Sequence, residues 1–142
     1  MSSHNADRVR RLFERAWNEG DMTVVSEVVH DEFVFSRDDG QQRGGPNLYS
    51  DLIASSRAVF PDMTFFIDDV IVGADEPKVV VRWTMTGTHE GEFKGVAPTG
   101  ETVELDGIEI NRFEDGQLVQ TWTHPNWVGF LEDVGVLPLD ED

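Results

Sequence analysis

The feature of this sequence that most constrains its fold is a change of hydrophobic period near residue 63. Before that point, apolar residues recur at the three- and four-residue spacing of one helix face. After it, β-branched and aromatic residues dominate four runs, at residues 63–72, 78–89, 102–113 and 118–124. Helices followed by long strands predict an α+β fold, in which the helices pack on one face of a curved, mostly antiparallel sheet.

Turn signals divide the first part of the chain. The expected elements are helices at residues 7–18 and 21–29, a strand at residues 33–35, a polar loop at residues 37–45, and a helix from residue 45 to the Phe60-Pro61-Asp62 turn. Gly20 suits the C-terminal cap of the first helix, and Asp21 suits the N-cap of the second. Pro46 is tolerated in the first turn of the third helix.

Turn signals separate the last three strand runs, with Pro98-Thr99-Gly100 before the third run, so we expect an antiparallel meander. Glu114-Asp115-Gly116 is the strongest hairpin signal of the chain. A curved sheet covered by helices leaves a conical pocket, and such pockets hold small ligands within an apolar lining.

The charge balance bears on partners and source. The chain has 28 acidic and 11 basic side chains, a net charge of −17. Such a surface repels phosphate backbones and anionic bilayers, so we expect no nucleic acid and no membrane as a partner. An acidic composition with few Lys suits a salt-rich cytoplasm, because salt screens self-repulsion. We therefore expect a halophilic source; an ordinary acidic protein is the alternative.

Several classes of protein are disfavoured. The chain has no Cys, which excludes disulfide frameworks and thiolate sites. It has no apolar run long enough to span a bilayer, and its polar start is unlike a signal peptide, so we expect one cytoplasmic domain over residues 1–142. The four His have no ligand-like spacing, so no metal site is expected.

A series of short motifs runs through most of the chain. They are Trp17-Asn18-Glu19-Gly20-Asp21, Phe60-Pro61-Asp62, Gly87-Thr88-His89-Glu90-Gly91-Glu92-Phe93-Lys94-Gly95 leading to Pro98-Thr99-Gly100, Arg112-Phe113-Glu114-Asp115-Gly116, and Trp122 with Val134-Gly135. In this order and spacing the chain resembles the SnoaL-like polyketide cyclases, or ester cyclases, of the NTF2-like superfamily. The resemblance implies a cone-shaped α+β barrel, a homodimer or homotetramer, and a buried ligand cavity without metal or organic cofactor.

The resemblance also implies a chemistry. The family's cyclases use a carboxylate to remove a proton from an activated carbon of a polyketide ester, and the ring closes on a neighbouring carbonyl. The family's acid/base Asp lies four residues after the last-strand Trp, a position that Asn126 occupies here. An amide cannot take that proton at neutral pH, although it can hold a carbonyl oxygen. His124, with an ordinary pKa of about 6.5, is a candidate replacement base, and another carboxylate is the alternative.

Other side chains are candidates for contact with a ligand. These are Trp17, Tyr49, Phe60, His89 and Trp122. Aromatic side chains, Trp83, Trp127, Phe65 and Phe130 among them, fill a core as readily as they line a cavity. His89 can equally be a solvated loop residue, and Asp62 suits a turn in which it bonds to nearby backbone amides.

The direction of Glu109 is left open by strand alternation. If Ile108 and Ile110 face the helices, Glu109 and Asn111 point away from the pocket. The opposite facing puts a carboxylate in an apolar cavity, where desolvation raises its pKa toward that of a useful base.

Three functions remain open. The first is a cyclase- or isomerase-type enzyme acting on a small apolar carbonyl compound, with His124 as base and Asn126 orienting oxygen. The second is a non-catalytic protein that binds a small ligand, which Asn126 at the Asp position favours. The third is a structural dimerisation module. A pocket lined by polar groups would exclude the third, and a titrating group within it would favour the first.

Overall fold

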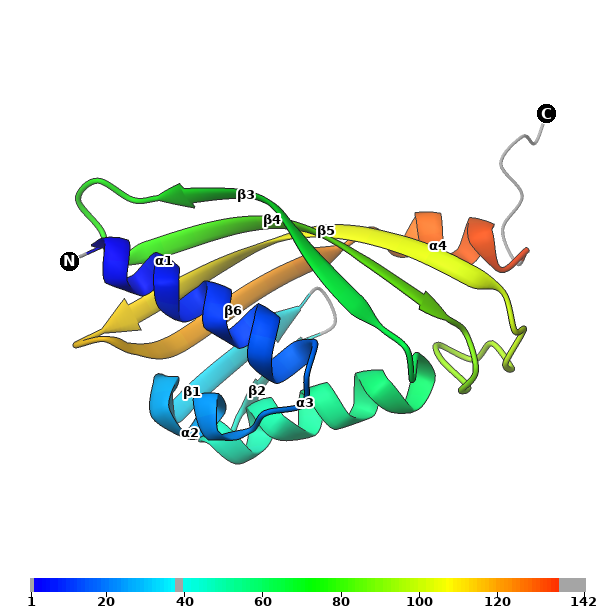
Figure 1. The fold of residues 1–142 in the computed structure, drawn as a ribbon, viewed down its shortest axis with the longest axis horizontal. Coiled ribbons are helices and arrows are strands. Elements are labelled where there is room, and N and C mark those ends of the chain that lie inside the picture. Colours follow the sequence, from blue (N-terminus) through cyan, green and yellow to red (C-terminus); the bar gives the residue numbers. More distant parts are fainter. Residues whose placement is uncertain (1, 38–39, 136–142) are drawn as a thin grey trace.

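A computed structural model describes residues 2–37 and 40–135 and has α+β architecture (Figure 1). The helical elements are α1 (Ser2–Arg11), the π-helix η1 (Leu12–Trp17), α2 (Thr23–Val28), α3 (Gly45–Val59) and α4 (Trp127–Asp133). The strands are β1 (Val29–Arg37), β2 (Gly40–Arg43), β3 (Thr64–Val72), β4 (Lys78–Thr88), β5 (Thr102–Glu114) and β6 (Gln117–Pro125). In Figure 1, α1, α2 and α3 lie along one side of the curved sheet.

The sheet has six strands in the order β2-β1-β6-β5-β4-β3. The parallel pairing joins β1 to β6, and the other four pairings are antiparallel, including the expected meander of β4, β5 and β6. The expected α+β fold is therefore confirmed. Within the described residues β2 and β3 are edge strands, so the sheet curves around the helices without closing into the expected barrel.

The first helix buries the face that its spacing predicts, with Val9, Leu12 and Phe13 all at most 3% exposed. Its second half widens into a π-helix, because the Asn18 backbone N–H donates to the Phe13 carbonyl five residues earlier. Gly20, at φ 76°, follows the end of this helix, as predicted.

Two elements were not predicted. Residues 37–45 contain β2, which pairs with β1 and is not a simple polar loop. All four residues of β2 are exposed and lack apolar alternation, so backbone pairing alone defines this strand. The short helix α4 begins after Asn126, whose side chain accepts a hydrogen bond from the Gly129 backbone N–H.

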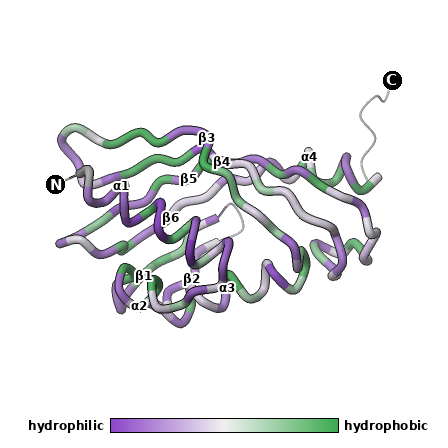
Figure 2. The backbone as a smooth tube through the Cα atoms, viewed as in Figure 1, coloured by the Kyte–Doolittle hydropathy of each residue, from purple (hydrophilic) through white to green (hydrophobic). Residues whose placement is uncertain are grey.

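The core lies between the helices and the inner face of the sheet. Figure 2 shows hydrophobic stretches in the strands and a mostly hydrophilic α1, which contributes one buried stripe. The β5–β6 hairpin turns at Asp115 and Gly116, both with positive φ as the predicted tight turn requires. Among the described residues, no helix is long and apolar enough to cross a membrane.

Candidate functional site

A cavity of about 100 Å³ lies between the helical layer and the sheet. Its walls are mainly aromatic and apolar, with four polar side chains among them. The lining residues are Phe13, Trp17, Phe35, Arg37, Leu52, Ser56, Phe65, Trp83, Leu105, Glu109, Thr123, Pro125 and Trp127. The site thus combines an apolar surface with a few polar groups, as small-ligand pockets do.

Glu109 faces this cavity because of the alternation along β5. Val103, Leu105 and Phe113 are buried, whereas Ile108 and Ile110 are 48% and 36% exposed on the outer face. Residues at odd positions of this strand therefore point toward the helices. Of the two facings that the sequence left open, the one with Ile108 and Ile110 toward the helices is wrong. Both Glu109 and Asn111 point inward.

The surroundings of Glu109 change its acidity. Burial disfavours the carboxylate and raises the pKa of Glu109 to about 7, while a hydrogen bond with the Asn111 side chain opposes part of that rise. Glu109 keeps some accessible surface because it borders the cavity. A carboxyl group with this pKa is present in both charge states at neutral pH and can therefore accept or donate a proton.

A buried polar network holds Asn111 beside Glu109. The Thr121 hydroxyl donates to Asn111 Oδ1 at 2.7 Å, and Asn111 Nδ2 donates to the Val79 carbonyl at 3.3 Å. Asn111 is 2% exposed and Thr121 is 3% exposed. Because both ends of the amide are engaged, its orientation toward Glu109 is fixed.

Trp17 and Tyr49, which the sequence offered as separate ligand-contact candidates, contact each other. Trp17 lines the cavity, and its indole N–H donates to the Tyr49 hydroxyl at 2.9 Å. Tyr49 is buried behind this wall and is not among the lining residues. Burial, followed by the negative charge of Glu109, raises the pKa of Tyr49 far above its ordinary value, so the phenol stays protonated.

The Trp17-Asn18 pair is anchored to two other elements. Asn18 exchanges two hydrogen bonds with the backbone of Phe65 on β3, at 2.7 and 3.0 Å. Arg57 Nη2 donates to the carbonyls of Trp17 and Asn18, both at 2.7 Å. These contacts satisfy groups at the end of the helix and fix the position of the Trp17 wall.

Trp127 is positioned by the turn that follows β4. Lys94 Nζ lies 4.3 Å from the Trp127 ring centroid, and the Phe93 ring lies 5.2 Å from it. Phe93 and Lys94, which belong to the sequence motif at residues 87–95, therefore have a structural role, because they pack on Trp127 at the start of α4.

The three candidates near the end of the last strand lie elsewhere. His124 is exposed and paired with Ile108, and Trp122 is half-buried and paired with Ile110, on the outer face of the sheet. Asn126 is exposed, caps α4 and donates to Asp106 Oδ1 at 3.3 Å. Among the described lining residues, Thr123 and Pro125 come from the end of β6, because alternation turns these two residues inward and turns Trp122 and His124 outward.

Phe60 and His89 lie in a separate aromatic cluster. Their ring centroids are 6.1 Å apart, and the Phe130 ring lies 5.4 Å from His89. His89 is 0% exposed, so it is not the solvated loop residue considered above; its Nδ1 lies 3.0 Å from the Thr99 hydroxyl. Neither residue belongs to the cavity lining in the described part of the chain.

Asp62 has a structural position. Its carboxylate accepts hydrogen bonds from the backbone N–H and the hydroxyl of Thr88, at 2.7 and 2.8 Å. These bonds lower the pKa of Asp62. They join the turn after α3 to the end of β4, so the backbone amide that Asp62 binds is distant in sequence.

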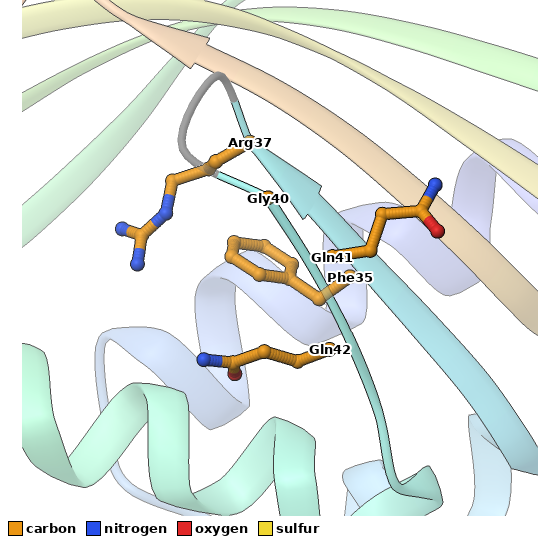
Figure 3. Close-up of a pocket in the computed structure, with 5 residues that line it drawn as sticks. All are labelled: Phe35, Arg37, Gly40, Gln41 and Gln42. Carbon is orange, nitrogen blue, oxygen red and sulfur yellow. The ribbon is translucent and has the colours of Figure 1, made fainter.

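A second hollow, of about 130 Å³, adjoins the cavity at the β1–β2 hairpin. Figure 3 shows its lining side chains, among them Phe35 and Arg37, which also line the cavity. The Arg37 guanidinium carbon lies 5.3 Å from the Phe35 ring centroid. The two hollows therefore form adjoining spaces next to the strand edge.

The described residues contain no cluster of three or more His, Asp or Glu arranged to hold a metal ion. Sequence reasoning did not single out Arg37, Ser56 or Thr123, the other polar lining residues. For Thr123 a signal existed, because it alternates with Trp122 and His124. For Arg37 and Ser56 we find none, since a polar residue on a helix or an edge strand is ordinary.

The open curved sheet, the helical layer and the cavity between them define a two-layer α+β protein with an internal cavity. The chain belongs to the SnoaL-like polyketide cyclase family, whose model matches residues 7–134. It is 27% identical to aklanonic acid methyl ester cyclase AcmA of Streptomyces galilaeus over an alignment of 128 residues. This alignment covers 89% of this chain and 88% of AcmA.

Solved structures have the same fold. AclR of Streptomyces galilaeus, described as a putative hydroxylase, is 27% identical, with a TM-score of 0.81 over 100% of this chain and 87% of AclR. IdmH of Streptomyces antibioticus is 28% identical, with a TM-score of 0.79 over 93% of this chain and 99% of IdmH.

Proposed function

We propose that this protein is a cofactor-independent acid–base enzyme that acts on a small apolar carbonyl compound, with Glu109 as its proton-transferring group. The observation that carries the proposal is the position of Glu109. Its carboxyl group lies in an aromatic-walled cavity and has a pKa of about 7. Buried carboxyl groups that titrate near neutrality are unfavourable for stability and are typical of acid–base sites.

The proposed reaction begins with a proton transfer from carbon. The Glu109 carboxylate takes a proton from a carbon between carbonyl groups, and the C–H electron pair forms the enolate. In a cyclisation, this carbon attacks a second carbonyl of the same molecule, and the resulting alkoxide is protonated. Glu109 can return the proton, since its carboxyl group has the intermediate acidity this requires. The cavity walls would supply the folded geometry that ring closure needs.

Glu109 takes the place in this proposal that His124 and Asn126 held on sequence grounds. Both of those side chains are exposed, and both lie outside the lining described above. A polyketide-type ester with two activating carbonyls is the substrate class that the family and the name of AcmA favour. The adjoining hollow at Phe35 and Arg37 offers space for the part of the substrate that extends beyond the cavity.

The test is deuterium exchange at the activated carbon of a panel of 1,3-diketones. We expect Glu109→Gln to slow exchange by roughly 10²- to 10⁴-fold, and the wild-type rate to rise with pH through about pH 7. Glu104→Gln is the matched control, because Glu104 lies on the same strand and is exposed. His124→Ala should leave the rate unchanged, and Asn126→Asp should not increase it.

Two results would overturn the proposal. One is wild-type exchange no faster than in buffer, which would favour the alternative of a non-catalytic small-ligand-binding protein. The other is a Glu109→Gln variant that keeps the wild-type rate.

We also propose that the protein forms a homodimer or homotetramer through the outer face of the sheet. Four large hydrophobic side chains are exposed there, Phe66, Ile71, Ile108 and Ile110, with exposures from 36% to 58%. Half-buried Trp122 lies beside Ile110 on the same face. Exposed apolar groups gathered on one face mark an interaction surface.

A further inference from the structure

Two lining residues of the cavity carry hydrogen-bond donors that have no partner. Among the described residues, four buried side-chain nitrogens lack one: Arg57 Nε, Trp83 Nε1, His89 Nε2 and Trp127 Nε1. The two indoles belong to residues that line the cavity. An indole N–H can only donate, and nearly all buried donors in proteins are paired. An unpaired donor in a cavity wall therefore points to an acceptor atom on the molecule that fills the cavity.

Trp83 is the more deeply placed of the two, at 4% exposure. It pairs with Gly107 across β4 and β5, and its ring lies over that glycine. A Cβ at position 107 would stand 2.9 Å from Cε2, the ring atom bonded to the indole nitrogen. Because Gly107 has no side chain, the edge of the indole ring next to the N–H can lie against β5. This strand also carries Glu109.

Trp83 and Glu109 are diagonal neighbours on the inner face. Glu109 pairs with Val81, two residues before Trp83, so their Cα atoms are about 7–8 Å apart. Both side chains line the same small cavity. A ligand that occupies it therefore borders both the Glu109 side chain and the indole ring that carries the unpaired N–H.

We propose that the indole N–H of Trp83 binds the carbonyl oxygen of the ligand, next to the carbon that faces Glu109. This inference rests on the proposed function and extends it. When Glu109 takes the proton, the C–H electron pair forms a C=C bond and the carbonyl π electrons move to oxygen. The indole donates a hydrogen bond to that oxygen and keeps its own proton. Fixed donors at the site where negative charge develops are an effective source of catalysis.

The test is direct binding of two probes of similar shape, acetophenone and ethylbenzene, of which the ketone alone carries an acceptor oxygen. We expect acetophenone to move the indole ¹H–¹⁵N signal of Trp83 downfield, and ethylbenzene not to do so. Trp83→Phe assigns that signal and should weaken acetophenone binding roughly three- to tenfold, with ethylbenzene within twofold. The ratio of the two affinities cancels any change in cavity size.

The matched control is Trp122→Phe, because Trp122 lies on the outer face of the sheet. It should leave both affinities unchanged. A shift of the Trp127 signal alone, an unchanged affinity ratio in Trp83→Phe, or the absence of acetophenone binding to the wild type would overturn the inference. The indole shift on the wild type needs no variant, so it remains decisive if Trp83→Phe does not fold.

Failure of this inference is distinguishable from failure of the proposed function. If deuterium exchange depends on Glu109 but the indole signal of Trp83 does not shift, the role of Trp83 is contradicted and the proposed function stands. A Trp83 response combined with full exchange in Glu109→Gln would remove the role of Glu109 and leave a binding site.

Discussion

The indole of Trp83 occupies the space that a side chain at position 107 would fill. An added Cβ at Gly107 would lie 2.9 Å from both Cε2 and Cη2 of the ring. Gly107 is not among the glycines with positive φ, so the glycine is required for space and not for backbone conformation. A residue without a side chain on β5 thus sets the position of a cavity wall that belongs to β4.

Gly107→Ala should lower the free energy of unfolding by about 1–3 kcal/mol, because the new methyl group pushes the indole off the sheet. Chemical denaturation measures the change. In a Trp83→Leu background the same substitution should cost much less, since the obstructing ring is gone. An equal cost in both backgrounds would show that this contact does not explain the glycine.

The stability of the wild type should fall as pH rises from about 4.5 to about 7. In the unfolded chain Glu109 loses its proton near 4.5, whereas in the folded protein burial holds it until about 7. The folded state therefore binds the proton more tightly, and this stabilising contribution is lost as pH rises. Glu109→Gln should gain stability relative to the wild type, up to about 3 kcal/mol above pH 7.

Denaturation across pH 4 to 8 measures this difference. Glu104→Gln removes a charge from the exposed face of the same strand and should show no comparable pH-dependent gain. If Glu109→Gln tracks the wild type at every pH, the carboxyl is not held in an apolar environment.

Asn111→Ala should raise the pKa of Glu109 further, because the amide hydrogen bond stabilises the carboxylate. Carbon-13 NMR of the Glu109 carboxyl follows its titration. Thr121→Ser keeps the hydroxyl that donates to Asn111 Oδ1 and should leave the titration where it is. A lower or unchanged pKa in Asn111→Ala would contradict the arrangement described for this network.

The melting temperature should rise from low salt to multimolar KCl. The net charge of −17 produces self-repulsion in the compact state, and salt screens it. Thermal unfolding followed by circular dichroism provides the measurement. A melting temperature that falls or stays flat would count against adaptation to a salt-rich cytoplasm.

Ile108→Lys should convert an oligomer to a monomer, because it places a charge in the centre of the exposed apolar face. Light scattering during gel filtration measures the mass. Val128→Lys is the control, since Val128 is 55% exposed but belongs to the helix α4 and not to a strand of the sheet. A wild type that runs as a monomer would refute the proposed assembly.

Local chemistry made much of the fold predictable. The helical spacing of Val9, Leu12 and Phe13 and the turn at Asp115 and Gly116 each specify their own backbone, and the structure has both. β2 and α4 carried weaker signals, because the strand is polar throughout and the helix is seven residues long. The parallel pairing of β1 with β6 joins distant segments and left no local trace.

The candidate site was predicted only in part. Trp17 was singled out and lines the cavity, and Glu109 was considered with both of its facings open. His124 and Trp122 followed from their place in the last strand, but alternation turns both toward the outer face. A period of two divides a strand into two sets of residues without telling which set is buried.

The amino-acid sequence by itself determined the α+β order of elements, the turns that join the strands, the acidic surface and the presence of Asn126 at the family's acid/base position. The tertiary structure alone decided that Glu109 and not His124 borders the cavity, and that Trp83, another lining residue, has an indole N–H without a partner among the described residues. The physical reason is that periodicity is a property of neighbouring residues. The choice of face is made by the helices that pack on the sheet, and it is from this packing that Glu109 obtains its altered pKa.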